Sequence, residues 1–170
     1  MDRYILYETY RLAILIDLIQ PAELIREIDL YITAASVEEI PHAFYVLSLA
    51  SNRRVMLELL TDLAKGVDQE LPSHIVAGLL YERRNQYDSK ELYRKAGMLA
   101  SLLRDPEEDV AVEFKELANR NESAQQAYGN RFKRKKTRER MLAKNELELQ
   151  RGLAKYAGFA QHFSFQEWGY

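Results

Sequence analysis

The sequence contains no cysteine, which excludes disulfide bonds and thiolate metal ligands as sources of stability. The 170 residues include 47% hydrophobic residues, so the chain is long and apolar enough to build a core without cross-links. A chain without cysteine suits a reducing compartment, and we therefore expect a cytoplasmic protein.

The sequence also lacks a long hydrophobic run. Its most apolar stretch, Leu12 to Ile19, is too short to cross a bilayer and contains Asp17. Asp2 and Glu8 interrupt the apolar residues near the start, and no small-residue cleavage site follows them. We therefore expect neither a signal peptide nor a membrane partner.

Motifs for chemistry are missing as well. Only seven glycines occur and none cluster, so no phosphate-binding loop is present. The three histidines, His42, His74 and His162, lack the spacing of a metal-binding motif such as H-E-x-x-H. Ser48 and Ser51 lack a glycine-flanked nucleophile turn. The sequence thus predicts a protein that is not an enzyme, with no catalytic residue, metal site or cofactor.

Proline is scarce, and its positions are informative. The four prolines are Pro21, Pro41, Pro72 and Pro106, and each stands just before an apolar periodic run with acidic or capping residues nearby. Proline fits the first helical turn, where its missing N–H would have no intrahelical partner. The chain therefore reads as successive helices with short connections.

Apolar residues recur at helical spacing along most of the chain. Residues 3–20 are expected to form a first, largely buried helix. The clearest amphipathic stripe then follows at Leu24, Ile25, Ile28, Tyr31 and Ile32. Further on, Ser51 or Asn52 is a candidate N-cap, Gly66 a candidate helix stop, and Asp88 with Glu91 a candidate capping box. The pattern predicts an all-α, single-domain bundle or short irregular helical solenoid of about seven or eight helices.

Beyond Asn119 the apolar pattern weakens and poor helix formers gather. We expect a helical core domain over residues 1–120, a charged helical segment over 121–158 packed on it, and an aromatic C-terminal tail over 159–170. Five large aromatic side chains stand in that tail, so it either folds over the core or contacts a partner.

Positive charge is concentrated in one segment. Residues 131–155 carry ten Lys or Arg and three Glu, although the whole chain has a net charge of -2. Residues 133–140 contain no apolar residue, so they are solvated, paired with the acidic 105–116 segment, or covered by a partner. The candidate partner-binding residues are Arg131, Lys133, Arg134, Lys135, Lys136, Arg138, Arg140, Phe163, Phe165 and Trp168.

The stretch IPHAFYVLSLASNRRVMLELLTDLAKG, residues 40–66, resembles a segment of the small helical bacterial immunity proteins that accompany polymorphic toxins. In both, a proline introduces a short helix that ends in an L-S-L-A type turn, and a leucine-rich helix follows. The resemblance implies a non-catalytic protein that neutralises a toxin by occluding its active site. It assigns no binding residue.

Taken together, these patterns predict a cytoplasmic protein-binding module, of the toxin-immunity or adaptor type, that acts by occlusion. Its partner is expected to be another protein, either a toxin or a second copy of this chain in a homodimer. The alternative is a nucleic-acid-associated protein that uses the basic segment 131–144, whose binding would fall steeply with added salt. Segregated charge favours fast association with an oppositely charged partner in either case.

Overall fold

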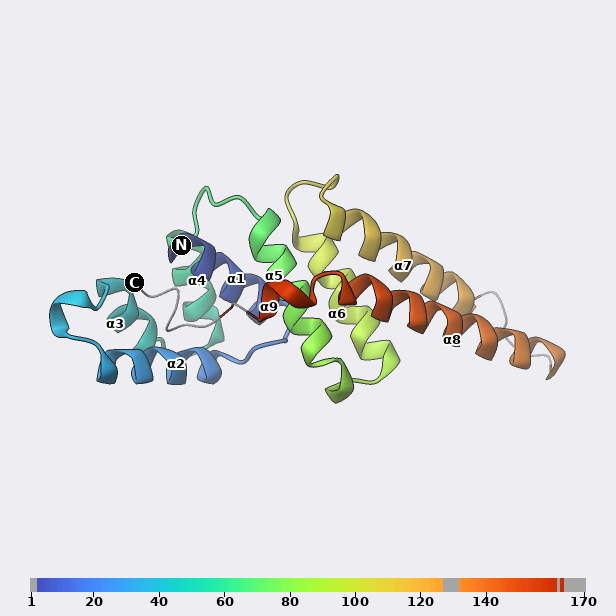
Figure 1. Ribbon diagram of the computed structural model, residues 1–170, viewed down its shortest axis with the longest axis horizontal. Helices are drawn as coiled ribbons and strands as arrows, with labels where there is room; N and C mark the ends of the chain where they lie inside the picture. Colours follow the sequence, from blue (N-terminus) through green and yellow to red (C-terminus); the bar gives the residue numbers. More distant parts are fainter. Residues whose placement is uncertain (1–2, 127–131, 162, 164–170) are drawn as a thin grey trace. The chain divides into compact units, whose positions relative to one another are not determined.

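The computed structural model describes residues 3–126, 132–161 and 163. In this part of the chain all regular structure is helical, which confirms the predicted all-α fold class (Figure 1). Eight α-helices have seven or more residues, and a ninth, α9, has four. The helices are α1 (Arg3–Leu15), α2 (Pro21–Ala34), α3 (His42–Ser48), α4 (Arg53–Leu63), α5 (Glu70–Glu82), α6 (Ser89–Leu102), α7 (Asp109–Gln126), α8 (Phe132–Ala154) and α9 (Ala157–Ala160).

Short 3-10 turns η1 (Val37–Glu39) and η2 (Arg84–Gln86) join some of these helices. The chain divides into two compact units, which we call unit 1 (Met1–Val76 and Gln161–Tyr170) and unit 2 (Ala77–Ala160). Helix α5 contributes residues to both units. Among the described residues, no helix combines the length and apolar character that crossing a membrane requires.

The core of unit 1 is built from apolar faces of α1 to α4. Helix α1 packs against α4, and α2 packs against α3. Phe44 on α3 is fully buried, and its ring meets Tyr31 of α2 at 5.2 Å and Tyr7 of α1 at 6.4 Å, both edge to face. These aromatic contacts join three helices through one side chain.

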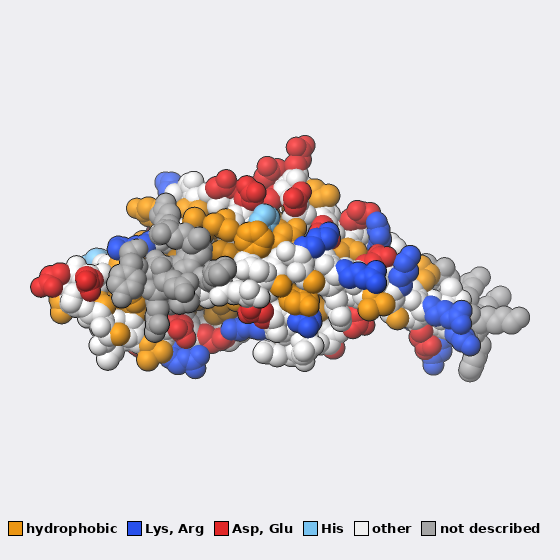
Figure 2. Space-filling view, in the orientation of Figure 1, with side chains coloured by type: hydrophobic (Ala, Val, Ile, Leu, Met, Phe, Trp, Pro, Cys, Tyr) orange, Lys and Arg blue, Asp and Glu red, His pale blue; other side chains and the backbone are white. Residues whose placement is uncertain are grey.

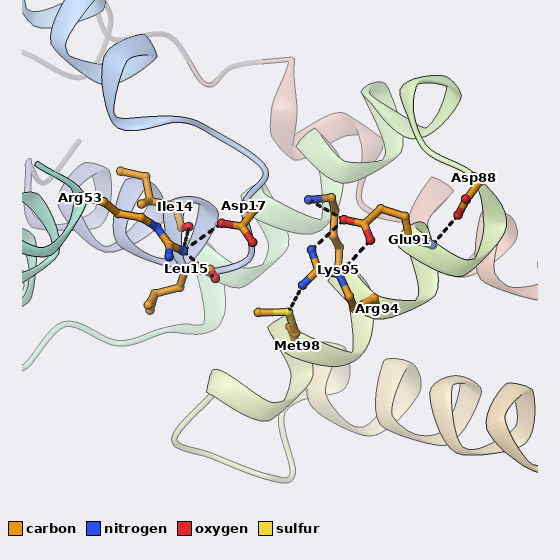
Figure 3. Close-up of polar contacts among 9 residues, drawn as sticks. All are labelled: Ile14, Leu15, Asp17, Arg53, Asp88, Glu91, Arg94, Lys95 and Met98. Carbon is orange, nitrogen blue, oxygen red and sulfur yellow. Dashed lines mark hydrogen bonds and ion pairs between the residues drawn. The ribbon is translucent and has the colours of Figure 1, made fainter.

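Helix α1 ends at Leu15, so the predicted helix over residues 3–20 is too long. Asp17 adopts a left-handed backbone conformation with φ 58°, and the Leu18 N–H bonds back to the Ala13 carbonyl. Arg53 of α4 donates hydrogen bonds of 2.8 Å and 3.3 Å to the carbonyl oxygens of Ile14 and Leu15 (Figure 3). Its guanidinium therefore satisfies carbonyls that have no partner within the helix.

Unit 1 also buries a charged pair. Glu8 of α1 is fully buried and accepts two hydrogen bonds of 2.6 Å from the guanidinium of Arg11, one turn away. The side-chain amide of Gln69, itself 5% exposed, donates a third bond to the same carboxylate. These three groups satisfy one another, so the cluster stabilises the approach to α5 rather than forming an open site.

The core of unit 2 is built on α6, α7 and α8. Helix α7 packs against α6 on one side and α8 on the other. Five of its six buried residues recur at alternating spacings of four and three, namely Val110, Phe114, Leu117, Asn121 and Ala124, and Ala111 is buried beside them. That spacing is the one found in coiled coils. Helix α7 therefore continues past Asn119, where the sequence pattern weakens, because Asn121 and Ala124 are still buried against its neighbours.

Helix α6 begins as predicted, with one difference. The Asp88 carboxylate accepts a 2.7 Å hydrogen bond from the Glu91 backbone N–H, which is half of the predicted capping box. The Glu91 carboxylate does not complete it, because it instead accepts hydrogen bonds from the guanidinium of Arg94, at 2.7 Å and 2.9 Å (Figure 3). A charge-assisted pair thus replaces the reciprocal cap.

Candidate functional site

Helix α8 carries the predicted basic segment. Its second half belongs to the core, since Asn145, Leu149 and Leu153 are buried. In its first half no residue of 135–144 is buried. Lys, Arg, Glu and Gln are good helix formers, so a helix can continue here with little apolar contact. We call residues 135–144 the distal segment of α8.

Four of the five cations of the distal segment have no ion-pair partner among the described residues, and the fifth, Lys144, pairs with Glu148 on the same helix. Lys135, Lys136 and Arg140 are exposed, and Arg138 is half-buried. Within the described part of the chain, none of these four side chains forms an ion pair. In Figure 2, Lys and Arg side chains are prominent along the part of the surface formed by α8. Four positive charges thus stand in water, close together on one helix.

The second half of α8 and the residue that follows it contrast with this, because Glu148 and Lys155 pair with α7. Lys155 donates a 2.6 Å hydrogen bond to Glu113, and Arg120 lies 3.3 Å from Glu148. Glu113 and Arg120 are seven residues apart, as are their partners, but the earlier of the two, Glu113, binds the later partner, Lys155. The order of the partners is thus reversed, and α7 and α8 form an antiparallel hairpin. Arg120 also pairs with Glu116 on its own helix.

One of the three alternatives for the basic segment, its pairing with residues 105–116, is therefore not found among the described residues. Of residues 135–144, only Lys144 forms an ion pair, at 3.7 Å to Glu148 on the same helix. The acidic segment uses Glu113 and Glu116 to bind Lys155 and Arg120 instead, because the antiparallel register places the distal segment beyond its reach.

A cleft of about 260 Å³ lies along the α7–α8 seam. Its lining residues are Glu113, Glu116, Leu117, Arg120, Glu148, Arg151, Gly152 and Lys155. Three acidic and three basic side chains balance one another there, and most of them are engaged in the pairs just described. Nearby, burial and the Glu113 charge raise the pKa of Tyr156 to about 12. The cleft therefore has no net charge with which to select a ligand.

Helix α6 also carries ionisable groups with shifted pKa values, and the causes of these shifts are contacts within the fold. The hydrogen bonds from Arg94 lower the pKa of Glu91 to about 2. Lys95, only 2% exposed, lies 3.4 Å from Glu91 and 4.7 Å from the centre of the Tyr87 ring. Burial raises the pKa of Tyr93 above its ordinary value. Glu91 thus pairs with Arg94 and Lys95, whereas Tyr93 lies near the charges of Glu148, Glu146 and Arg120.

Several predicted partner-binding residues are not described. Arg131, Phe165 and Trp168 lie outside the described residues, and Lys133 and Arg134 belong to α8 without described side chains. The structure does place Phe163.

The Phe163 ring lies 5.3 Å from that of Tyr10, on α1 in unit 1, and it is half-buried. At this one position the aromatic tail folds against the core, which is one of the two fates expected for it. Phe163 lies beyond the end of α9 and belongs to unit 1, whereas the distal segment belongs to unit 2.

Leu147 and Arg151 were not predicted from the sequence as exposed residues on the outward face of α8. Leu147 is 56% exposed and Arg151 is exposed, although both stand in the half of the helix that reaches the core. The signal was available, because Leu147 does not fit the helical spacing of Leu142, Leu149 and Leu153, of which the last two are buried. An apolar side chain outside the buried stripe lies on the exposed face of the helix.

Among the described residues, no group of three or more His, Asp or Glu side chains is arranged to hold a metal ion. Comparison of the chain with protein-family models, with curated proteins and with solved structures finds no match.

Proposed function

We propose that this protein is a non-catalytic protein-binding module, and that the distal segment of α8 binds an acidic surface of its partner. One observation carries the proposal. Lys135, Lys136, Arg138 and Arg140 have no ion pair among the described residues, whereas most charges along the α7–α8 seam are paired: Glu113 with Lys155, and Arg120 with Glu116 and Glu148. Unpaired like charges on one helix repel one another, so a partner of opposite charge would relieve that repulsion.

The distribution of charge favours a protein over a nucleic acid. Unit 1 contains 13 Asp or Glu and only six Lys or Arg, whereas unit 2 contains 13 and 18. The excess of positive charge is thus confined to unit 2 and the whole chain has a net charge of -2, whereas a general nucleic-acid-binding chain is usually basic overall. Exposed Met141 and Leu147 on α8 offer apolar surface that a protein partner would bury. Binding at this helix would occlude the partner's surface without any chemical step.

The type of partner follows from the same argument. An acidic protein is the class that the distal segment fits, and a toxin neutralised by occlusion is one member of it, in line with the resemblance of residues 40–66 to immunity proteins. A homodimer is the competing arrangement, in which the acidic surface belongs to a second copy. Nucleic-acid binding by residues 131–144 is the second candidate function, because the same four unpaired cations also suit phosphates.

Affinity capture from a nuclease-treated extract of the producing cells tests the proposal. The bait is the full chain, compared with a variant that changes Lys135, Lys136, Arg138 and Arg140 to Gln. A matched control changes four other exposed cations to Gln: Arg26, Lys65, Lys90 and Lys115. We expect one protein to be retained by the native chain and the control, and lost by the distal-segment variant.

The capture experiment can also contradict the proposal. Equal retention by both variants would remove the distal segment from the interface. Retention of RNA or DNA from an untreated extract, with no protein retained after nuclease treatment, would support the nucleic-acid function instead. Sedimentation of the native chain alone distinguishes a homodimer, which would be lost in the distal-segment variant.

A further inference from the structure

One line of exposed residues runs along the whole outward side of α8, opposite its buried residues. Its members recur at spacings of three or four: Lys136, Arg140, Ala143, Leu147, Arg151 and Ala154. All six are exposed, and the buried residues Asn145, Leu149 and Tyr156 stand on the other side of the helix turn. We call these six residues the outer stripe. It spans about 27 Å, or five helical turns, at 1.5 Å per residue.

The outer stripe combines three properties. Leu147 near its middle is 56% exposed and apolar. Ala143 and Ala154 are small, which lets a second helix approach to the usual interaxial distance of about 8–10 Å. Lys136, Arg140 and Arg151 are cations without an ion pair among the described residues. An apolar centre with cations on both sides has the pattern of a helix-docking face.

We propose that the outer stripe docks an α-helix of the partner protein, with apolar residues opposite Leu147 and carboxylates opposite the three cations. This inference rests on the proposed function and specifies which structural element of the partner is bound. The partner helix would extend α7 and α8 into a three-helix arrangement, because its own residues at spacings of three and four match the stripe.

The charge of the outer stripe and the helical spacing of its residues together favour an acidic α-helix over other occupants. A nucleic-acid strand offers phosphates along its length, but Ala143 and Leu147 interrupt the cations where such a strand would pass. An extended peptide repeats every two residues and would not keep its side chains opposite a stripe with helical spacing. An acidic amphipathic helix satisfies both the cations and the exposed leucine.

Two labelled peptides test the docking mode by fluorescence anisotropy with the full chain. The first is an 18-residue Glu/Ala/Leu helix with leucines on one face and glutamates at both ends. The second has the same composition, permuted so that its leucines share no face. We expect the first peptide to bind at least about tenfold more tightly, since a few buried contacts dominate such interfaces.

The matched variants are Leu147→Asp and Val112→Asp. Val112 on α7 is 50% exposed and lies outside the stripe, so its replacement controls for added negative charge. We expect Leu147→Asp to weaken binding of the first peptide about tenfold or more. Val112→Asp should leave it within about twofold. Far-ultraviolet circular dichroism and urea unfolding establish that both variants remain folded.

Three outcomes would overturn the inference, and they separate it from the proposed function. Equal binding of the two peptides, unaffected by Leu147→Asp but abolished by the four Gln changes in the distal segment, would leave a protein-binding surface without helix docking. Binding of a 20-nucleotide RNA with no binding of either peptide would overturn both proposals. A native dimer that Leu147→Asp dissociates would assign the docked helix to a second copy, not to another protein.

Discussion

Gly78 of α5 lies so close to Tyr156 that a Cβ atom at position 78 would stand 2.5 Å from the Tyr156 carbonyl oxygen. It would also lie 3.0 Å from the Ala160 backbone nitrogen. Both neighbours are backbone atoms, which cannot move away as the end of a flexible side chain can. The glycine therefore permits the close packing of α5 against the segment that follows α8.

Gly78→Ala should destabilise the protein, by about 1–3 kcal/mol, although alanine is the better helix former. The control is Gly158→Ala, because a Cβ at Gly158 meets no atom within 4 Å. That change should leave stability unchanged or raise it by up to about 1 kcal/mol. Urea unfolding measures both. Equal effects of the two changes would contradict the close approach at Gly78.

Arg53→Ala should lower the free energy of unfolding by about 1–2 kcal/mol. The change removes two hydrogen bonds to the end of α1 and a 3.0 Å ion pair with Asp17. The neighbouring Arg54 is the control, since its pair with Glu58 is exposed and Arg54→Ala should have no measurable effect. Thermal and urea unfolding of both variants check this. A stable Arg53→Ala protein would mean that α1 ends without the help of Arg53.

Asn121→Leu should raise the free energy of unfolding by about 1 kcal/mol. Asn121 and Asn145 are 7% and 9% exposed, and neither side-chain amide has a hydrogen-bond partner among the described residues. The antiparallel register places them within one turn of each other on α7 and α8. Polar residues at such positions specify register at a cost in stability. Urea unfolding tests the gain, and sedimentation tests whether the variant self-associates. A destabilised variant would show that the amide is satisfied.

The contribution of Glu91 to stability should depend on pH. Because its folded-state pKa is about 2 and its ordinary value is 4.5, the unfolded chain takes up the proton first as pH falls. The stabilisation is full above pH 4.5 and is lost as pH falls towards 2. Glu91→Gln should therefore cost more stability at pH 7 than at pH 3. In an Arg94→Gln background most of that pH dependence should disappear, and its persistence would contradict the assigned cause.

Much of the helical fold could be predicted from local signals, because capping and helix termination depend on few residues. The Asn52 carboxamide caps α4 with a 3.0 Å bond from the Val55 N–H, and Gly66 has the positive φ of 82° expected of a helix stop. Pro21 begins α2 as predicted. Each of these signals acts within one helical turn of the residue that gives it, so a short stretch of sequence is enough to predict where the helix begins or ends.

Errors arose where a distant residue decides the local structure. Helix α1 ends at Leu15, where Asp17 takes a left-handed conformation and Arg53, 38 positions from Leu15, binds the Leu15 carbonyl group. Helix α7 passes Asn119 because residues further along pack against its neighbours, which overrides the weak propensity of that stretch. Glu91 was expected to cap its helix, and its bonds with Arg94 compete with that role.

The candidate site was only partly predictable for the same reason. The density of cations in residues 131–140 is visible in the sequence, but whether they are paired depends on the register of α7 and α8. That register pairs Lys155 with Glu113 and leaves Lys136 and Arg140 without partners among the described residues. The exposure of Leu147 likewise follows from which face of α8 the hairpin buries.

The most direct test of the account is photo-crosslinking in the producing cells, with a photoreactive amino acid at position 140 or, as a control, at position 115. Arg140 lies in the distal segment and Lys115 is an exposed cation on α7. The account predicts a covalent adduct with an acidic protein from position 140 and none from position 115. Adducts with RNA or DNA from position 140, or the same protein adducts from both positions, would contradict it.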